Sequence, residues 1–292
     1  MTALIHAMSV LTDPAQAGAV TIALPQDVQG EAYDYPVEFF EKRVHHIERR
    51  PPTMAQVSRI VDLIKAAQKP YIICGGGVRY SEAGRAFADF CEKFGMPFGE
   101  TQAGKGCIPW DHPCNLSGIG VTGSLAANRL AKEADLIIGA GTRFGDFTTC
   151  SKWLFQNPSA KFVSINVSPF DAYKMNAEPI IADAKLTLQA VGRKLGTAAY
   201  RAQWGEAIAK AREDWNREVD ALYNQEDPKG LSQIRVIGEL NDVLLPKNAI
   251  VVSGSGSIPS DMQRTWRTRV PGTYHMEYGF SCMGYEIAAA LG

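Results

Sequence analysis

The sequence has no paired cysteine motif and no apolar run long enough to cross a membrane. Its 6 cysteines include no Cys-x-x-Cys pair, which argues against a zinc site or a disulfide framework and favours reduced thiols. A basic leader segment, internal repeats and low-complexity segments are also missing. Lys plus Arg total 30 and Asp plus Glu total 31, so no excess of positive charge marks a surface for nucleic acid or membrane. We therefore expect a soluble, cytoplasmic protein whose partners are small molecules or copies of itself.

Strands and helices alternate through the middle of the 292-residue chain, which is long enough for more than one domain. Thr53, Ser81 and Asp183 are candidate amino-terminal caps of helices in this region. Continuous apolar runs typical of buried strands occur at residues 71–74, 96–98, 135–139, 162–167 and 180–182. This order predicts an α/β fold, with a doubly wound parallel sheet covered by helices on both faces.

The two ends of the chain carry patterns that are too short to bury a core. Residues 1–35 contain one helical pattern near residues 4–11 and one apolar strand pattern at residues 19–24, whereas a domain needs two packed layers. Residues 230–292 restart the strand and helix alternation but offer few strands. We therefore expect a complete central Rossmann-like domain at residues 53–196, flanked by parts of two other domains, in a chain that is a fragment.

Two connecting segments separate these regions. Residues 36–52 combine prolines with basic side chains, as linkers often do. Within them, His45 and His46 have no acidic or thiol-bearing neighbours spaced to complete a metal site, so we interpret them as part of a solvated face. Residues 197–229 carry a polar helical pattern that we expect to bridge domains.

Glycine-rich turns follow several of the expected strands. The turns at Gly75–Gly77 and Gly139–Gly145 lie where a doubly wound fold brings backbone N–H groups to an anionic ligand. Neither has the spacing of a dinucleotide fingerprint, so a nucleotide site and a tight structural turn both remain open. At residues 252–257 a strand ends in alternating Gly and Ser directly before a helix. This pattern can hold a diphosphate or form a flexible turn.

The last stretch of the sequence combines small residues with one large flexible side chain. Gly279, Ser281 and Gly284 permit close backbone approach, and Met283 lies between them. The alanines at residues 288–290 permit a tight helix contact. The residues themselves indicate a turn approached by a ligand, without identifying that ligand.

Several longer motifs together resemble one enzyme family. They read GAVTIALPQDVQ at 18–29, ETQAGKG at 100–106, PWDHP at 109–113, GTRFGDFTT at 141–149, FQNP at 155–158 and YHMEYGFSCMGYE at 274–286. Over nearly its whole length the chain resembles the thiamine-diphosphate enzymes of the acetolactate synthase type. Within that type it is most similar to the trihydroxycyclohexanedione hydrolases of myo-inositol catabolism.

The resemblance implies roles for the domains and for five residues. Residues 1–35 correspond to the end of a pyrimidine-binding domain and residues 230–292 to the beginning of a diphosphate-binding domain. Thiamine diphosphate and Mg²⁺ are the implied cofactors, held between subunits of a homodimer or homotetramer. The residues implied to contact the cofactor are Ser255, Gly256 and Ser257 at the diphosphate, and Ser281 and Met283 at the aminopyrimidine.

The implied reaction is hydrolytic cleavage between the two carbonyl carbons of a cyclic vicinal dione, which gives deoxyglucuronate. The resemblance places the activating glutamate before Met1 and the magnesium ligands after Gly292, so we expect no catalytic or metal-binding residue within the chain and no turnover by the chain alone. We also expect the apolar side chains of this last stretch to be partly exposed, namely those of Phe280, Met283, Ile287 and Leu291. Two alternatives stay open: an acetolactate synthase-like carboligase or decarboxylase, and a nucleotide-binding central domain without catalysis.

Overall fold

The computed structural model describes residues 2–254, 256–277, 279–280 and 282–292. The chain divides into two compact units, residues 1–50 and 51–292, which are described separately. No helix in the described part of the chain has both the length and the apolar character needed to span a membrane.

The first unit contains one helix and little other regular structure. Helix α1 (Thr2–Thr12) confirms the helical pattern at the start of the sequence. Two short 3₁₀ turns follow, at Val28–Gly30 and Val37–Phe39. The strand predicted at residues 19–24 is wrong, because these residues form no strand and Leu24 is exposed. A strand needs a neighbour to bond its N–H and C=O groups, and the described residues of this unit supply none.

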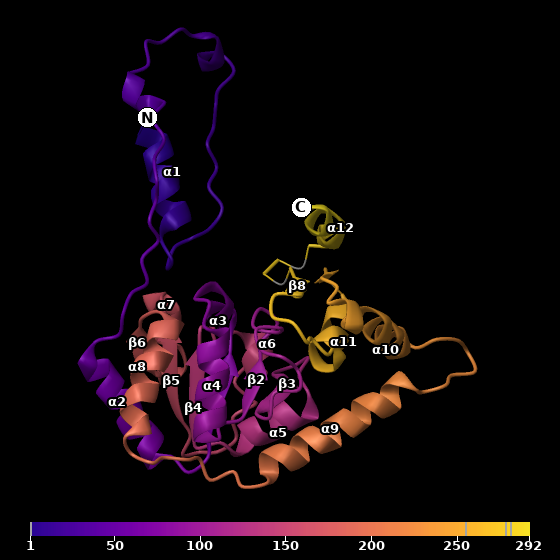
Figure 1. Cartoon of the computed structure of the whole chain (residues 1–292). Coiled ribbons are helices and arrows are strands. Elements are labelled where there is room, and N and C mark those ends of the chain that lie inside the picture. Colours follow the sequence, from indigo (N-terminus) through magenta and orange to yellow (C-terminus); the bar gives the residue numbers. More distant parts are fainter. Residues whose placement is uncertain (1, 255, 278, 281) are drawn as a thin grey trace. The chain divides into compact units, whose positions relative to one another are not determined.

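The second unit is built on six parallel strands, which confirms the α/β expectation (Figure 1). The strand order is β3-β2-β1-β4-β5-β6. From β1 the chain first adds strands on one side of the sheet (β2, β3) and then on the other (β4, β5, β6), so the topological switch point lies between β1 and β4. The loops after these two strands therefore leave the sheet at the same edge, where doubly wound folds place ligands. The strands are β1 (Pro70–Cys74), β2 (Phe98–Glu100), β3 (Asn115–Gly118), β4 (Leu136–Ala140), β5 (Lys161–Asn166) and β6 (Glu178–Ile181).

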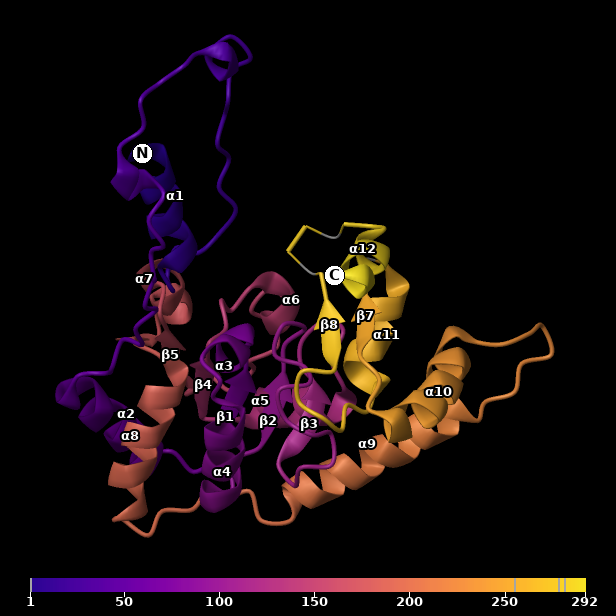
Figure 2. The same cartoon turned by 45° about the horizontal axis from the view of Figure 1, so that its top comes forward.

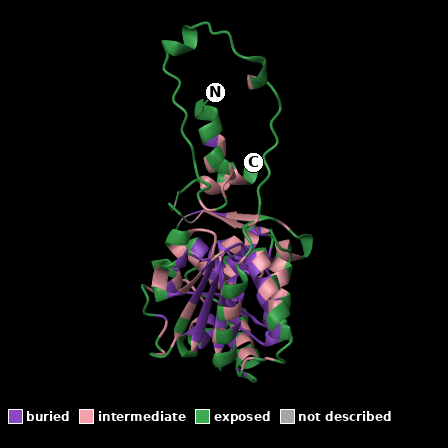
Figure 3. Ribbon diagram, turned by 90° about the vertical axis from the view of Figure 1, so that its left-hand side faces the viewer, coloured by how far each residue is buried: buried purple, intermediate pink, exposed green. Residues whose placement is uncertain are grey.

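Helices cover both faces of this sheet and bury its apolar side chains (Figure 3). Phe87 and Leu188 belong to a core on one face, and Leu130 and Trp204 belong to a core on the other. The first core is formed with α2 (Met54–Ala66), α4 (Gly84–Phe94) and α8 (Ala184–Gly196), and the second with α5 (Leu125–Glu133) and α9 (Ala207–Tyr223). Shorter helices on the loops are α3 (Gly76–Tyr80), α6 (Asp146–Thr149) and α7 (Pro169–Ala172), with a 3₁₀ turn at Lys174–Asn176.

The predicted helix caps have different outcomes. Thr53 Oγ1 accepts a hydrogen bond from Gln56 N at 3.2 Å, and Gln56 Oε1 accepts one from Thr53 N at 2.8 Å, which completes a capping box. Asp183 caps α8 as predicted. The prediction for Ser81 is wrong, because Ser81 ends α3 and α4 begins only at Gly84. Ser81 Oγ instead donates to Val78 O at 3.4 Å, so it is not available to a following helix.

A second, smaller sheet lies in the carboxyl-terminal part of this unit. Strands β7 (Val251–Ser253) and β8 (Tyr274–Met276) pair in parallel. The helices of this part are α10 (Gln233–Leu244), α11 (Ser257–Thr265) and α12 (Tyr285–Leu291), with a 3₁₀ turn at Leu245–Lys247. Figures 1 and 2 show α11 beside the β3 edge of the large sheet, where the two elements are in contact.

Candidate functional site

Glycines in the loops that follow β1 and β4 bring these two loops into close contact. Gly75 N donates to Ala140 O and Gly77 N donates to Gly141 O, both at 2.9 Å. A Cβ atom at Gly77 would lie 2.6 Å from Gly141 Cα, and one at Gly75 would collide with Gly141 O. The N–H groups of Gly75 and Gly77 are therefore used inside the protein. The close contact between the two turns supports a tight structural turn at Gly75–Gly77.

The turn between β7 and α11 is open to a ligand. Gly256 precedes α11 with φ 115°, a conformation that favours glycine. Among the described residues, no side chain caps the first N–H groups of α11. Ser257 begins the helix, and its hydroxyl donates to Gln233 Oε1 at 3.0 Å. Of the residues predicted to contact a diphosphate, Gly256 and Ser257 lie together at this helix start, whereas Ser255 lies outside the described residues.

A carboxylate organises the loop that precedes α12. Glu277 accepts hydrogen bonds from Phe280 N at 2.8 Å and from Cys282 N at 2.6 Å. The loop ends at Gly284, which has φ 88°. Met283, next to it, has an exposed fraction of 87%. Ser281 lies outside the described residues.

The exposed face predicted for this stretch is confirmed. Phe280 is 92% exposed, and Ile287 is 77% exposed. With Met283 and Leu291 these side chains form an apolar surface on α12 and the loop before it.

Glu286 lies close to the β7–α11 turn. A Cβ atom at Gly254 would collide with Glu286 Oε2, the end of a flexible side chain, so this carboxylate lies beside the backbone that follows β7. The carboxylate oxygen is buried and has no hydrogen-bond partner among the described residues. A carboxylate oxygen suits a cation or a donor, and a helix start suits a phosphate. The start of α11 therefore fits a diphosphate, whereas no cluster of three or more metal-ligating side chains occurs in the described part of the chain.

A buried ion pair joins Glu100, the last residue of β2, to Lys105 in the loop that follows. Glu100 and Lys105 are each 2% exposed, and Lys105 Nζ lies 3.8 Å from Glu100 Oε2. Burial raises the pKa of Glu100, while Lys105 and the N–H of Gly106 oppose that shift. Burial also lowers the pKa of Lys105, and Glu100 opposes it. Each charge therefore depends on the other to remain ionised in the interior.

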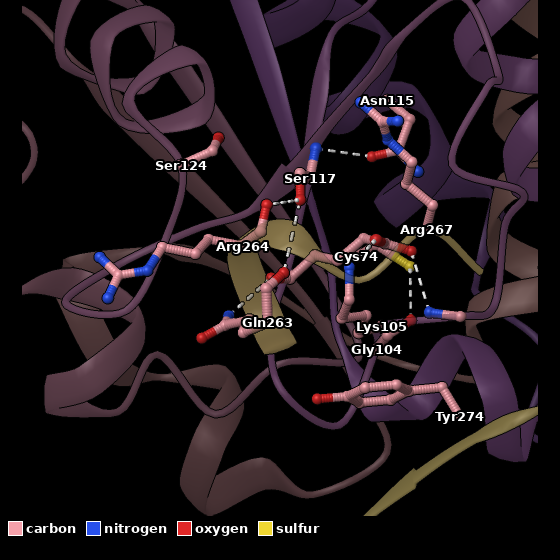
Figure 4. Close-up of polar contacts among 12 residues, drawn as sticks. Cys74, Gly104, Lys105, Asn115, Ser117, Ser124, Gln263, Arg264, Arg267 and Tyr274 are labelled. Carbon is pink, nitrogen blue, oxygen red and sulfur yellow. Dashed lines mark hydrogen bonds and ion pairs between the residues drawn. The ribbon is translucent and has the colours of Figure 1, made fainter. Parts of the chain in front are cut away.

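Hydrogen bonds join α11 to β2, to β3 and to the loop that follows β3 (Figure 4). Gln263 Nε2 donates to Glu100 O at 3.1 Å and to Ile119 O at 3.2 Å, and Gln263 Oε1 accepts from Thr122 Oγ1. Ser117 Oγ donates to Arg264 O at 3.0 Å. These contacts fix the helix that carries the candidate diphosphate turn.

Sequence patterns did not indicate Glu100, Lys105, Gln263 or Glu277 as parts of a site. Gln263 forms hydrogen bonds with residues more than 140 positions away in the sequence. The local spacing of residue types does not predict such a pairing. The local signals were the ETQAGKG motif, which contains both members of the ion pair, and the YHMEYGFSCMGYE motif, which contains Glu277.

Comparison with known proteins identifies the segment that contains the large sheet. Residues 57–191 match the family model for the central domain of thiamine pyrophosphate enzymes. This segment is a thiamine pyrophosphate enzyme central domain. Membership of this family implies thiamine diphosphate as the cofactor.

Close relatives match the chain over its whole length. It is 52% identical over 316 residues to the 3D-(3,5/4)-trihydroxycyclohexane-1,2-dione hydrolase of Clostridium tetani. It is 54% identical to a second protein of that name from Bacillus cereus and 53% identical to one from Bacillus thuringiensis. Each match covers 100% of this chain and 49% of the relative. The chain therefore spans about half the length of these relatives.

Proposed function

We propose that the chain is part of a thiamine-diphosphate-dependent hydrolase that opens the ring of trihydroxycyclohexane-1,2-dione to 5-deoxy-glucuronate in inositol catabolism. The observation that carries this proposal is an identity of 52% to 54% over the whole chain with hydrolases named for that dione. These matches cover 100% of the chain, both units included, which favours one shared reaction over a shared central domain alone.

The β7–α11 turn is proposed to hold the diphosphate. The N–H groups at the start of α11 point in the direction that favours an anion. Gly256 keeps side-chain atoms away from the turn, and Ser257 adds a hydroxyl. Ser255 completes this set by resemblance. Mg²⁺ is proposed to accompany the diphosphate, and the unpaired oxygen of Glu286 would favour a cation there.

The loop before α12 is proposed to meet the aminopyrimidine. Glu277 holds the loop by accepting two of its backbone N–H groups. Met283 then presents a large, exposed side chain, which suits support of a bent cofactor, with Ser281 beside it by resemblance. When bound, thiamine diphosphate supplies a carbon nucleophile for a carbonyl of the dione.

The domain assignment and the assembly remain part of the proposal. Residues 1–35 are proposed as the end of a pyrimidine-binding domain and residues 230–292 as the beginning of a diphosphate-binding domain, with linkers at 36–52 and 197–229. The exposed apolar face of Phe280, Met283, Ile287 and Leu291 supports a covering partner, in a cytoplasmic homodimer or homotetramer.

A chimera tests the reaction. The 292 residues replace the matching half of the Clostridium tetani hydrolase, and the product is assayed with thiamine diphosphate and Mg²⁺ present. We expect the chimera to consume the dione and to leave pyruvate unchanged, whereas the 292 residues alone give no turnover. Formation of an acetohydroxy acid from pyruvate, with the dione untouched, would establish the carboligase alternative instead.

A further inference from the structure

The carboxylate of Glu100 closes the loop at residues 100–106 on itself. Glu100 Oε1 accepts a hydrogen bond from Gly106 N at 3.2 Å, and Glu100 Oε2 lies 3.8 Å from Lys105 Nζ. Gly106 has φ 77°, which permits the tight return of the chain. The beginning and the end of the loop are therefore joined through one buried side chain.

The closed loop contacts the carboxyl-terminal part of the unit through its backbone. Glu100 O accepts a hydrogen bond from Gln263 Nε2 in α11 at 3.1 Å. Gly106 O accepts one from Gly272 N at 3.2 Å, just before β8. A Cβ atom at Gly106 would lie only 2.9 Å from Tyr274 Cβ, so the loop and β8 are in close contact. A change in the loop would displace both elements.

Side chains add further links between the loop and the same two elements. Gln102 Nε2 donates to Pro259 O, in the first turn of α11, at 3.1 Å. Arg79 Nη2 donates to both Lys105 O at 2.6 Å and Tyr274 O at 3.0 Å. Lys105 Nζ lies 5.8 Å from the centre of the Tyr274 ring, and the two side chains are neighbours in Figure 4.

A small cavity borders the ion pair. Its volume is about 20 Å³, and Trp110, Asn115 and Arg267 contribute to its lining beside Glu100 and Lys105. A space of this size accommodates at most one water molecule. The pair therefore lies almost without water, between the central domain and the segment that carries the β7–α11 turn.

We propose that Glu100 and Lys105 are positioning residues that fix the start of α11 on the central domain and thereby set the geometry of the diphosphate turn. This inference rests on the proposed function for its link to the cofactor. Its structural part, control of α11 by the ion pair, stands on the contacts within the chain. The contacts of these two residues within the described part of the chain do not include Gly256, Ser257 or Met283, so we assign them no catalytic role.

Hydrogen exchange of the 292-residue chain tests the structural part. Lys105→Met keeps the length of the side chain and removes its charge. We expect amides of α11 and β8 to exchange about 10-fold faster in this variant, while amides of β4 and β5 stay within about 2-fold of the wild type. Lys93→Met is the matched control, because Lys93 lies 5.4 Å from the centre of the Phe94 ring, away from this junction. It should leave α11 and β8 unchanged.

Glu100→Gln provides a second variant if Lys105→Met does not fold. It retains an acceptor for Gly106 N and removes only the negative charge, and we expect the same local pattern. An equal increase over β1, β4 and β5 in the folded variant would overturn the proposal, because it would show a general loss of stability. Unchanged exchange in α11 would overturn it as well.

Binding of inorganic pyrophosphate tests the link to the cofactor. Titration calorimetry on the same proteins should show at least about 5-fold weaker binding for Lys105→Met and Glu100→Gln than for Lys93→Met, a fold-change that corresponds to about 1 kcal/mol. Equal affinities in the presence of altered α11 exchange would overturn the proposed control of the turn. Absence of binding to the wild type would contradict the proposed diphosphate site itself, and hydrogen exchange would still decide the control of α11.

Discussion

Replacing Gln263 with alanine removes three hydrogen bonds that hold α11 against the large sheet, two of them fully buried. Gln263 is 1% exposed. Its amide donates to Glu100 O and Ile119 O and accepts from Thr122 Oγ1. A Cβ atom at Gly118 would lie 2.6 Å from Gln263 Cγ, so the side chain fills its site closely. Alanine leaves two carbonyl groups and a hydroxyl group without this partner.

The expected cost follows from these contacts. At about 1 kcal/mol for each net hydrogen bond, Gln263→Ala should lower the free energy of unfolding by about 3 kcal/mol. The groups that lose their hydrogen bond to Gln263 stay buried, so water cannot readily replace the lost bonds. Gln225→Ala is the matched control, because Gln225 is exposed and should change the free energy by less than about 0.5 kcal/mol.

Urea unfolding followed by tryptophan fluorescence measures this difference. Trp266 is buried in the cluster that contains Tyr274 and Met262, so its emission reports on the α11 region. A decrease in the free energy of unfolding below about 0.5 kcal/mol for Gln263→Ala would refute the reasoning, since so small a decrease is typical of surface substitutions. A loss equal to that of Gln225→Ala would do the same.

Three further predictions concern other parts of the chain. Burial lowers the pKa of His112. The stability contributed by its neutral ring is therefore present above about pH 6.5 and is lost as the pH falls through the folded-state pKa. Urea unfolding between pH 5 and 8 should show this loss, and an equally steep loss in His112→Asn would contradict the prediction. Gly75→Ala should lower the free energy of unfolding by about 2 kcal/mol or more, because the methyl group collides with the backbone of Gly141; unchanged urea midpoints would contradict the close contact. Cys282 is exposed and should react with a thiol reagent under native conditions well before buried Cys74 does; equal rates measured by mass spectrometry would contradict the placement of α12.

Local sequence signals predicted the elements that have strong local causes. The capping pair Thr53 and Gln56 marked the start of α2, and continuous apolar runs marked β1 and β4, which are buried on both faces. Strand β3 (Asn115–Gly118) was missed, because it is short and polar and Ser117 has φ 68°. The run at residues 19–24 had a strand pattern without a partner strand, so the pattern alone was misleading.

The candidate site was predictable only where it is local. The Gly and Ser residues before α11 indicated an anion-binding turn, and the structure places Gly256 and Ser257 at a helix start. The hydroxyl of Ser257 bonds Gln233, a partner that the sequence did not indicate. The ion pair of Glu100 and Lys105 was not predictable, because its proposed role depends on burial next to Tyr274, and that burial depends on the whole fold.

The most direct test of the proposed hydrolysis is the proton balance of the reaction. Hydrolytic cleavage between two carbonyl carbons adds one water and yields one aldehyde and one carboxylic acid, which is ionised at neutral pH. In a pH-stat, the chimera with the Clostridium tetani relative should release one proton for each dione consumed, only with thiamine diphosphate and Mg²⁺ present. A folded, cofactor-loaded chimera that consumes no dione, or consumes it without releasing a proton, would contradict the proposed function.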